Sequence, residues 1–319
     1  QSAIITFVSD HEDLFLRIFA GSSFLTRIIR TRPDLLGELA VEGPDVFCEK
    51  ILTRLYELDL SCDRDILMRD LRLYRQSISL VTAMADIAGI WSLEKVTGTL
   101  TDFADASVRV SLDWLLKNKS AQYGLDTPLT ADQCQCVILG MGKYGARELN
   151  YSSDIDIVVF YEPDGIASLG EHKIAEFWIE LTKDLSTILQ STTDAGFVFR
   201  VDLRLRPDPG STPVAVSLPA AEIYYESFGQ NWERAAFIKA RQIAGDTRTG
   251  NKLLSILSPF IWRKNLDFAA IEDVHAMKRQ IHAVRGHGQI AIAGHNIKLG
   301  RGGIREIEFF VQTQQLIAG

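Results

Sequence analysis

The spacing of apolar and polar residues predicts that the first part of the chain is helical. Through residues 1–120, apolar side chains recur at three- and four-residue intervals, which places them on one face of a helix. The helix that Ser22 and Ser23 can cap shows this stripe. Pro33 interrupts the pattern, and Gly43-Pro44 starts a further helix with proline at its first position. Residues 63–91 and 92–117 predict two longer helices. We expect plain helix packing here; a partner-docking surface is the alternative.

Short apolar runs in the second part predict a small sheet. Residues 134–140 and 154–161 are typical of strands, with a turn of helix at 146–149 between them. Strict alternation over 197–206 predicts the most regular strand of the chain, and 213–218 predicts a return strand. The amphipathic segment 171–190 predicts a helix that covers the sheet.

The remaining segments predict mostly helices. They cover residues 218–228, 247–258, 267–285 and the stretch from Ile304, whereas 231–243 fits a helix or, in its second half, a strand. We therefore expect an α+β fold that is mostly helical, with a small mixed sheet between helical regions. The expected regions are 1–122, 123–246 and 247–319.

The composition indicates a globular protein and argues against several other classes. The chain has 319 residues, of which 46% are hydrophobic, as expected of a globular fold. Its net charge of −7 argues against general binding of DNA or RNA. We expect no membrane span and no signal peptide, and since the chain begins with Gln1, we expect the numbering to start inside a longer chain. The four cysteines lack zinc-ligand spacing, which favours reduced thiols and a cytoplasmic protein.

The chemistry of the chain is concentrated after residue 139. A glycine-rich stretch, Gly140-Met141-Gly142-Lys143-Tyr144-Gly145, is followed by Asp154 and Asp156. Residues two apart on a strand point to the same face, so the two carboxylates should project together. Paired carboxylates suit a hard cation such as Mg²⁺, and a glycine turn can bring backbone N–H groups to a phosphate. The stretch therefore predicts metal-dependent phosphate chemistry.

Other interpretations of the glycines are weaker. The G-x-G-x-x-G match would need a crossover helix before a second parallel strand, but only residues 146–153 separate Gly145 from Asp154. A P-loop would need serine or threonine after Lys143, where the chain has Tyr144. A tight turn followed by merely solvated acids remains an alternative.

Asp202 is a candidate third acid. It lies on the polar face of the alternating segment 197–206, together with Arg204 and Arg206. Three carboxylates can hold two cations for displacement at phosphorus, and the arginines can clamp phosphate oxygens. The alternative is a solvated face on which these charges pair with one another.

Further candidates are less specific. Lys239 and Arg241 have two interpretations, as anion ligands or as simply exposed residues. Gly300-Arg301-Gly302-Gly303 is a candidate second anion site at a helix start, with a plain helix-entry turn as the alternative. Glu306 and Glu308 fall in the first turn, where the helix dipole favours acids. The histidines at 275, 282, 287 and 295 are read as exposed residues and not as a metal cluster.

These motifs together resemble a known family, that of the bifunctional glutamine synthetase adenylyltransferase/adenylyl-removing enzymes. The resemblance covers most of the chain and rests on Gly140–Asn150 with Ser152-Ser153-Asp154-Ile155-Asp156, Val201–Pro207, Asn231-Trp232-Glu233-Arg234, Lys239-Ala240-Arg241 and Gly300–Phe310. The residues of these motifs are more similar to the N-terminal half of that family, which implies that the chain is an isolated N-terminal fragment. One departure is Lys143, where the wider DNA polymerase β-like superfamily often has serine.

The resemblance implies a polymerase β-like nucleotidyltransferase that removes AMP from an adenylylated tyrosine of glutamine synthetase. Phosphate would attack the AMP phosphorus and ADP would leave, with Asp154, Asp156 and Asp202 holding Mg²⁺ or Mn²⁺. Phosphate or nucleotide contacts are expected from Gly142, Lys143, Ser153, Arg204, Arg206, Lys239, Arg241 and Arg301, with Glu233 and Glu308 as supporting carboxylates.

The motifs leave other functions open. Forward adenylylation from ATP needs the same acids, and a regulatory module that binds nucleotide without chemistry is a further alternative. The partners implied by the resemblance are glutamine synthetase, the PII signal protein and a C-terminal adenylyltransferase domain of a longer chain.

Overall fold

The computed structural model describes residues 2–166, 168–262, 295–298 and 300–318. It confirms the mostly helical α+β fold with a small mixed sheet. The predicted helix 267–285 and the histidines at 275, 282 and 287 lie outside the described residues. In the described part, no helix has both the length and the apolar character needed to cross a membrane.

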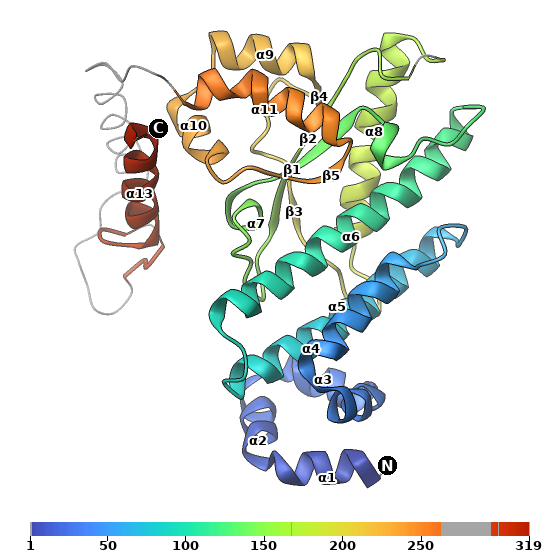
Figure 1. The fold of residues 1–319 in the computed structure, drawn as a ribbon, viewed down its shortest axis with the longest axis vertical. Helices are drawn as coiled ribbons and strands as arrows, with labels where there is room; N and C mark the ends of the chain where they lie inside the picture. Colours follow the sequence, from blue (N-terminus) through green and yellow to red (C-terminus); the bar gives the residue numbers. More distant parts are fainter. Residues whose placement is uncertain (1, 167, 263–294, 299, 319) are drawn as a thin grey trace.

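The first part of the chain is a stack of helices, as predicted (Figure 1). Their bounds are α1 Ser2–Asp10, α2 Glu12–Gly21, α3 Ser23–Thr31, α4 Asp34–Tyr56, α5 Arg64–Ile87 and α6 Leu93–Gln122. Ser22 and Ser92 cap α3 and α6 through their side chains. Gly43 has a φ of 72°, so α4 is kinked where the sequence predicted a new helix to start at Gly43-Pro44.

The sheet has five strands in the order β3-β2-β1-β5, with β4 also paired to β2. The strands are β1 Cys136–Gly140, β2 Ile155–Tyr161, β3 Val201–Asp202, β4 Ala215–Ser217 and β5 Arg241–Gly245. β1 is antiparallel to β2 and β5, whereas β3 and β4 run parallel to opposite ends of β2. The antiparallel β1–β2 pair agrees with the argument against a dinucleotide-binding crossover.

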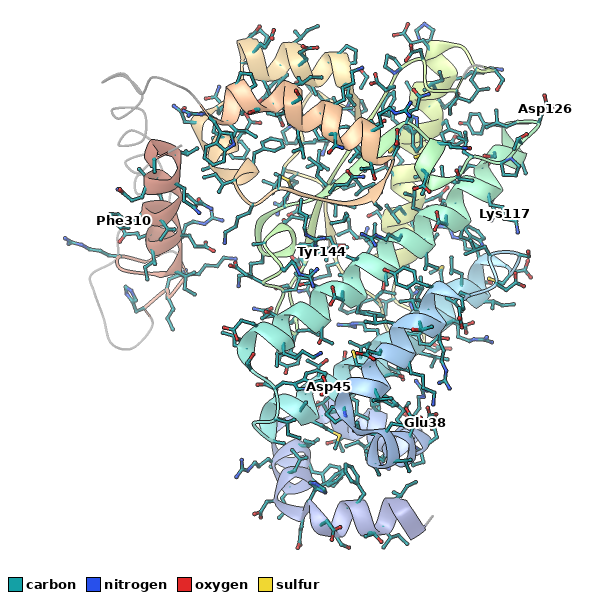
Figure 2. The ribbon with its side chains drawn as sticks, in the orientation of Figure 1. Glu38, Asp45, Lys117, Asp126, Tyr144 and Phe310 are labelled. Atoms are coloured by element: carbon teal, nitrogen blue, oxygen red, sulfur yellow. The ribbon has the colours of Figure 1, made fainter. Side chains whose placement is uncertain are left out.

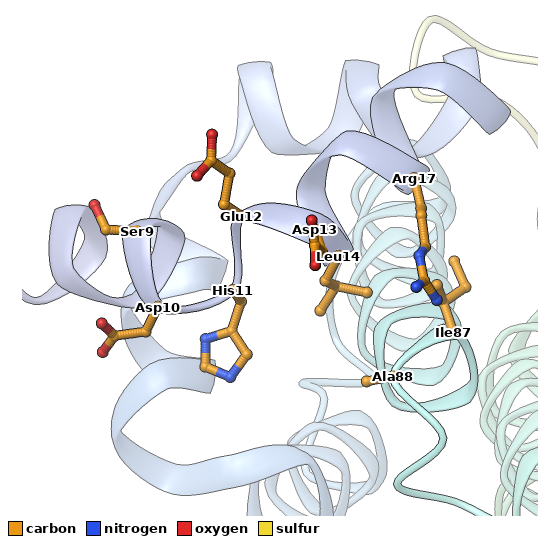
Figure 3. Close-up of a pocket in the computed structure, with 9 residues that line it drawn as sticks. All are labelled: Ser9, Asp10, His11, Glu12, Asp13, Leu14, Arg17, Ile87 and Ala88. Atoms are coloured by element: carbon orange, nitrogen blue, oxygen red, sulfur yellow. The ribbon is translucent and has the colours of Figure 1, made fainter.

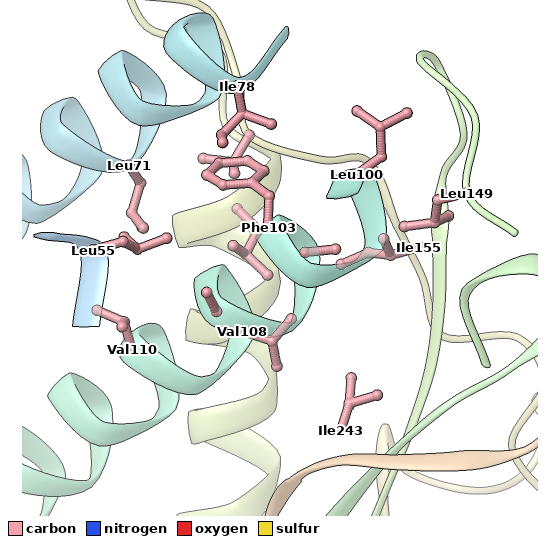
Figure 4. Close-up of a cluster of buried hydrophobic side chains, with 14 of the residues drawn as sticks. Leu55, Leu71, Ile78, Leu100, Phe103, Val108, Val110, Leu149, Ile155 and Ile243 are labelled. Carbon is pink, nitrogen blue, oxygen red and sulfur yellow. The ribbon is translucent and has the colours of Figure 1, made fainter. Parts of the chain in front are cut away.

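Alternation along the strands divides the core between the two faces of the sheet. Ile138 and Ile157 join the large cluster formed with α4, α5, α6 and α8 (Glu171–Gln190), part of which is drawn in Figure 4. Leu139 and Val158 face the second cluster, under α9 (Leu218–Ser227), α10 (Asn231–Phe237) and α11 (Thr247–Ile261). Asp156 lies between Ile155 and Ile157 on β2, so it points to the side of the second cluster.

Two predicted elements differ from the structure. The turn of helix expected at 146–149 occurs earlier, as α7 Gly142–Gly145, whose first residue Gly142 has a left-handed φ of 54° two residues after the end of β1. The strand expected over 197–206 is reduced to the two residues of β3. Its polar side chains turn the backbone, since Arg206 donates hydrogen bonds to the carbonyls of Leu203, Pro209 and Thr212.

Other predictions were correct within a few residues. Residues 231–243, left undecided, divide into α10 and β5. The C-terminal helix is α13 Ile304–Ala318, which lies beside the rest of the molecule near α10. The four cysteines are free thiols, and three of them are buried.

Candidate active site

The three predicted acids lie at neighbouring ends of two strands. Asp156 of β2 and Asp202 of β3 are direct partners in the parallel ladder, so their side chains project from the same face of the sheet. Asp154 precedes β2 by one residue and has the same parity as Asp156. The structure therefore brings together the acids that are far apart in sequence.

Asp156 is the innermost carboxyl group of the three. Partial burial and the charges of Asp202 and Asp154 raise its pKa to about 6, although Arg204 and Lys298 act in the opposite direction. Within the described residues no side chain donates a hydrogen bond to this carboxylate. A bound cation would offset the repulsion between this half-buried carboxylate and the two others.

The two outer acids each pair with an arginine. Arg200 donates to Asp154 through Nε and to the carbonyl of Ser152. Arg204 bonds Asp202 with Nε at 3.0 Å from both oxygens and Nη2 at 2.5 Å, which lowers the pKa of Asp202. The alternative interpretation of this segment, that its charges pair with one another, is therefore also seen in the Arg204–Asp202 contact.

The three acids are the right kind of ligand for a divalent cation, but the described side chains are not yet arranged around one. Three carboxylates supply the hard oxygen ligands that Mg²⁺ or Mn²⁺ prefers. Across the described ranges, however, no group of three or more His, Cys, Asp or Glu side chains is close enough to hold a metal ion. Arg200 and Arg204 compete with a cation for two of the acids, and because the Arg204 side chain is 83% exposed, water can replace Asp202 as its partner.

The glycine turn lies directly against the acids. A Cβ built on Gly142 would be 3.4 Å from Oδ2 of Asp156, and Met141 N–H donates to the Asp156 carbonyl at 2.9 Å. Gly145 is packed more tightly, since a Cβ there would be 1.9 Å from the carbonyl oxygen of Lys239. Tyr144, between these glycines, is fully buried beside α6 (Figure 2). Glycine is thus required for close packing as much as for any ligand.

The predicted basic ligands separate into available and engaged groups. Lys143 and Arg301 are exposed, and Arg204 is reachable from solvent. Lys239 pairs with Glu148 at 2.9 Å, and Arg206 holds backbone carbonyls in the 203–212 turn. Ser153 is bonded to the Asn150 side chain at 2.7 Å.

Arg241 and Glu233 have structural partners. Arg241 forms a two-pronged pair with Asp105 of α6, at 2.7 and 3.1 Å. Glu233 is buried, accepts the Gln230 N–H in a capping box, and has its pKa raised by burial. Glu308 is half-buried on α13.

Sequence reasoning missed several residues that shape the site. Arg200 occupies the same alternating face as Asp202, which was a usable signal. Lys298 acts on Asp156 across the fold. Asp105 lies in a long helix, where no local pattern marks it as the partner of Arg241.

A small mixed sheet with acids at adjacent strand ends and a glycine turn beside them is the arrangement expected of the nucleotidyltransferase class. Comparison with known proteins makes the assignment specific. A family model described as glutamate-ammonia ligase adenylyltransferase matches residues 13–256, and the chain belongs to that family. A second model, GlnD PII-uridylyltransferase, matches residues 275–319.

Individual relatives agree with this membership. The chain is 49% identical to the bifunctional glutamine synthetase adenylyltransferase/adenylyl-removing enzymes of Mesorhizobium japonicum, Rhizobium meliloti and Xanthobacter autotrophicus. The matches cover 97%, 97% and 94% of this chain, and 32%, 32% and 30% of the relatives. The chain thus spans about a third of the length of these relatives.

Proposed function

We propose that this chain carries a metal-dependent nucleotidyltransferase centre that removes AMP from an adenylylated tyrosine of glutamine synthetase by phosphorolysis. The observation that carries the proposal is the ladder pairing of Asp156 with Asp202, beside Asp154 and the turn at Gly142. The names of the relatives support the substrate. The removing direction is supported by the resemblance of the motifs to the N-terminal half of the family.

In the proposed reaction, a phosphate oxygen attacks the AMP phosphorus. The bond between that phosphorus and the tyrosine oxygen breaks, ADP forms, and the phenolate takes a proton from water. Tyrosine has an unperturbed pKa near 10, so the phenolate is a fair leaving group. Mg²⁺ or Mn²⁺ held by the three acids would neutralise charge on the attacked phosphate and the departing oxygen.

The protein's own contribution is positioning and charge. Phosphoryl-type transfer depends mainly on these two effects, and the site offers acids and cations without a nucleophilic side chain. We assign Lys143 and Arg204 to contacts with phosphate oxygens because both are reachable from solvent near the acids. When a cation binds to the three carboxylates, Arg204 would leave Asp202 and pair with a phosphate oxygen instead.

The direct test supplies adenylylated glutamine synthetase, phosphate and Mg²⁺ and measures ADP. Asp154→Asn and Asp202→Asn should each reduce the rate by at least about a hundredfold. Glu176→Gln, which removes an exposed carboxylate on α8, is the matched control and should retain the parent rate. Equal ADP release by the Asp154→Asn variant would refute the site assignment.

Two further experiments separate the alternatives. Transfer of labelled AMP from ATP to unmodified glutamine synthetase would indicate forward adenylylation. Metal-dependent nucleotide binding without ADP or AMP transfer would indicate a regulatory module. In vivo partners such as the PII protein and a C-terminal adenylyltransferase domain remain part of the proposal for the longer chain.

A further inference from the structure

A cavity lies between the N-terminal helices and the loops that lead to the acids. Its volume is about 510 Å³, within the range of small-molecule sites. One face of α5 forms a wall through Arg72, Arg75, Ser79 and Ala83, which recur at helical spacing. The other walls come from α3 and from the loops at 151–152 and 195–197.

The lining of this cavity is cationic. It contains Arg27, Arg72 and Arg75 against one acid, Asp86, whose carboxylate accepts the Tyr151 hydroxyl at 2.7 Å. Within the described residues, none of the three arginines lies within salt-bridge distance of a carboxylate. Burial and the charges of Arg200 and Arg72 lower the pKa of Arg75 to about 10, as expected of crowded cations.

The three arginines have different tasks. Arg72 is fully buried and donates to the carbonyls of Met68, Ile188 and Gly196, and to that of Ser191, so it holds the loop in place. Arg75 makes one hydrogen bond in the described structure, from Nη1 to the Phe197 carbonyl at 2.8 Å. A guanidinium has five N–H donors, so Arg75 keeps donors for a ligand.

Aromatic rings flank the donor group. The Arg75 guanidinium carbon is 4.5 Å from the centre of the Phe197 ring and 5.9 Å from that of Phe24. Arg27 lies 5.9 Å from the same Phe24 ring. Apolar residues of the lining, such as Leu25 and Ile87, continue these walls. Cations beside aromatic rings provide both a charge and a flat apolar surface.

We propose that this cavity binds a small organic anion with a flat apolar body, the acid group on Arg75 and Arg27 and the body against Phe24 and Phe197. The site is separate from the three acids and needs no divalent cation. A phosphate or a carboxylate could supply the negative group, because a guanidinium pairs with either in a two-pronged manner. Both sources therefore enter the test.

A hollow elsewhere in the described part of the chain does not offer this chemistry. It measures about 430 Å³ at the junction of α1 and α2 and is lined by Asp10, Glu12, Asp13 and Arg17 among others (Figure 3). The carboxylates of Asp10 and Glu12 point in different directions in that view. Its lining carries three carboxylates against one arginine, and no phenylalanine is among its described lining residues.

The test measures binding of phenyl phosphate, benzoate and neutral benzyl alcohol to the whole chain in EDTA, by saturation-transfer NMR. Phenyl phosphate or benzoate should bind saturably in the millimolar range or tighter, and benzyl alcohol and inorganic phosphate should bind more weakly. Arg75→Gln should weaken anion binding by about tenfold or more, since it removes a charge-assisted pair. A preference between the two anions would identify the acid group.

The controls keep the proposal falsifiable. Arg27→Gln and Arg30→Gln change exposed arginines three residues apart on α3, but only Arg27 lines the cavity. Arg27→Gln should weaken binding by about threefold and Arg30→Gln should not, so the comparison stands even if Arg75→Gln fails to fold. Absence of saturable anion binding, or equal losses in the two α3 variants, would overturn the proposal. Asp156→Asn should leave this binding unchanged, which separates the outcome from that of the proposed function.

Discussion

Replacing Asp156 by asparagine should stabilise the folded chain when divalent cations are absent. The carboxyl pKa is raised to about 6 from a usual value near 3.8, so the folded protein holds this proton more tightly than the unfolded chain does. Stability is therefore lost as pH rises from about 4 through about 6. At pH 7.5 the ionised carboxylate carries the full cost, and Asp156→Asn removes it.

The size of this effect follows from the pKa. The difference between the two values corresponds to about 3 kcal/mol at most. Because Asp156 is only half-buried, screening by solvent reduces the expected gain to about 1–2 kcal/mol. At pH 5, between the two pKa values, only about half of this cost has accrued, so the gain should fall to about 0.5–1 kcal/mol.

Urea denaturation in EDTA at pH 5 and pH 7.5 measures both values, with Glu176→Gln as the exposed control. Adding Mg²⁺ at pH 7.5 should then stabilise the parent and have less effect on Asp156→Asn, since a ligand bound only by the folded state adds to stability. A variant less stable than the parent at pH 7.5, or the same difference at both pH values, would refute the electrostatic reasoning.

Two further predictions concern the scaffold of the site. Gly145→Ala should cost about 2–4 kcal/mol of unfolding free energy and impair activity, because its Cβ would overlap the Lys239 carbonyl, whereas Gly98→Ala, in open space on α6, should be neutral or stabilising by up to about 1 kcal/mol. Asp105→Asn should cost about 3 kcal/mol in the same denaturation assay because its arginine partner on β5 is left half-buried, while Asp102→Asn, which breaks an exposed ion pair, should cost less than about 1 kcal/mol. Equal costs within either pair of variants would contradict the packing described.

Much of the helical part was predictable because its signals are local. Periodic apolar stripes, the capping residues Ser22 and Ser92, and the break at Gly43 are each read from a few neighbouring residues. The same holds for β2 and α8, where apolar patterning and boundaries agree closely with the structure.

The segment 197–206 was mispredicted because tertiary contacts overrode its alternation. Val198, expected on the polar face, is fully buried, and its N–H and that of Phe199 both donate to the Leu189 carbonyl at the end of α8. The pairing of Asp156 with Asp202 could be suggested from sequence, but its register depends on where β3 meets β2. The engagement of Arg206 and Arg241 by distant groups left no trace in local sequence.

The shortness of β3 should determine how the site formed by the three acids loses activity on heating. Asp154 and Asp156 are carried at the start of a seven-residue strand bordered on both sides, whereas Asp202 is held to the sheet by a ladder of only two residues. Segments with so few backbone bonds open at a lower free-energy cost than the surrounding domain. The third acid should thus detach while the helical body is still intact, so that thermal inactivation precedes loss of helical circular dichroism.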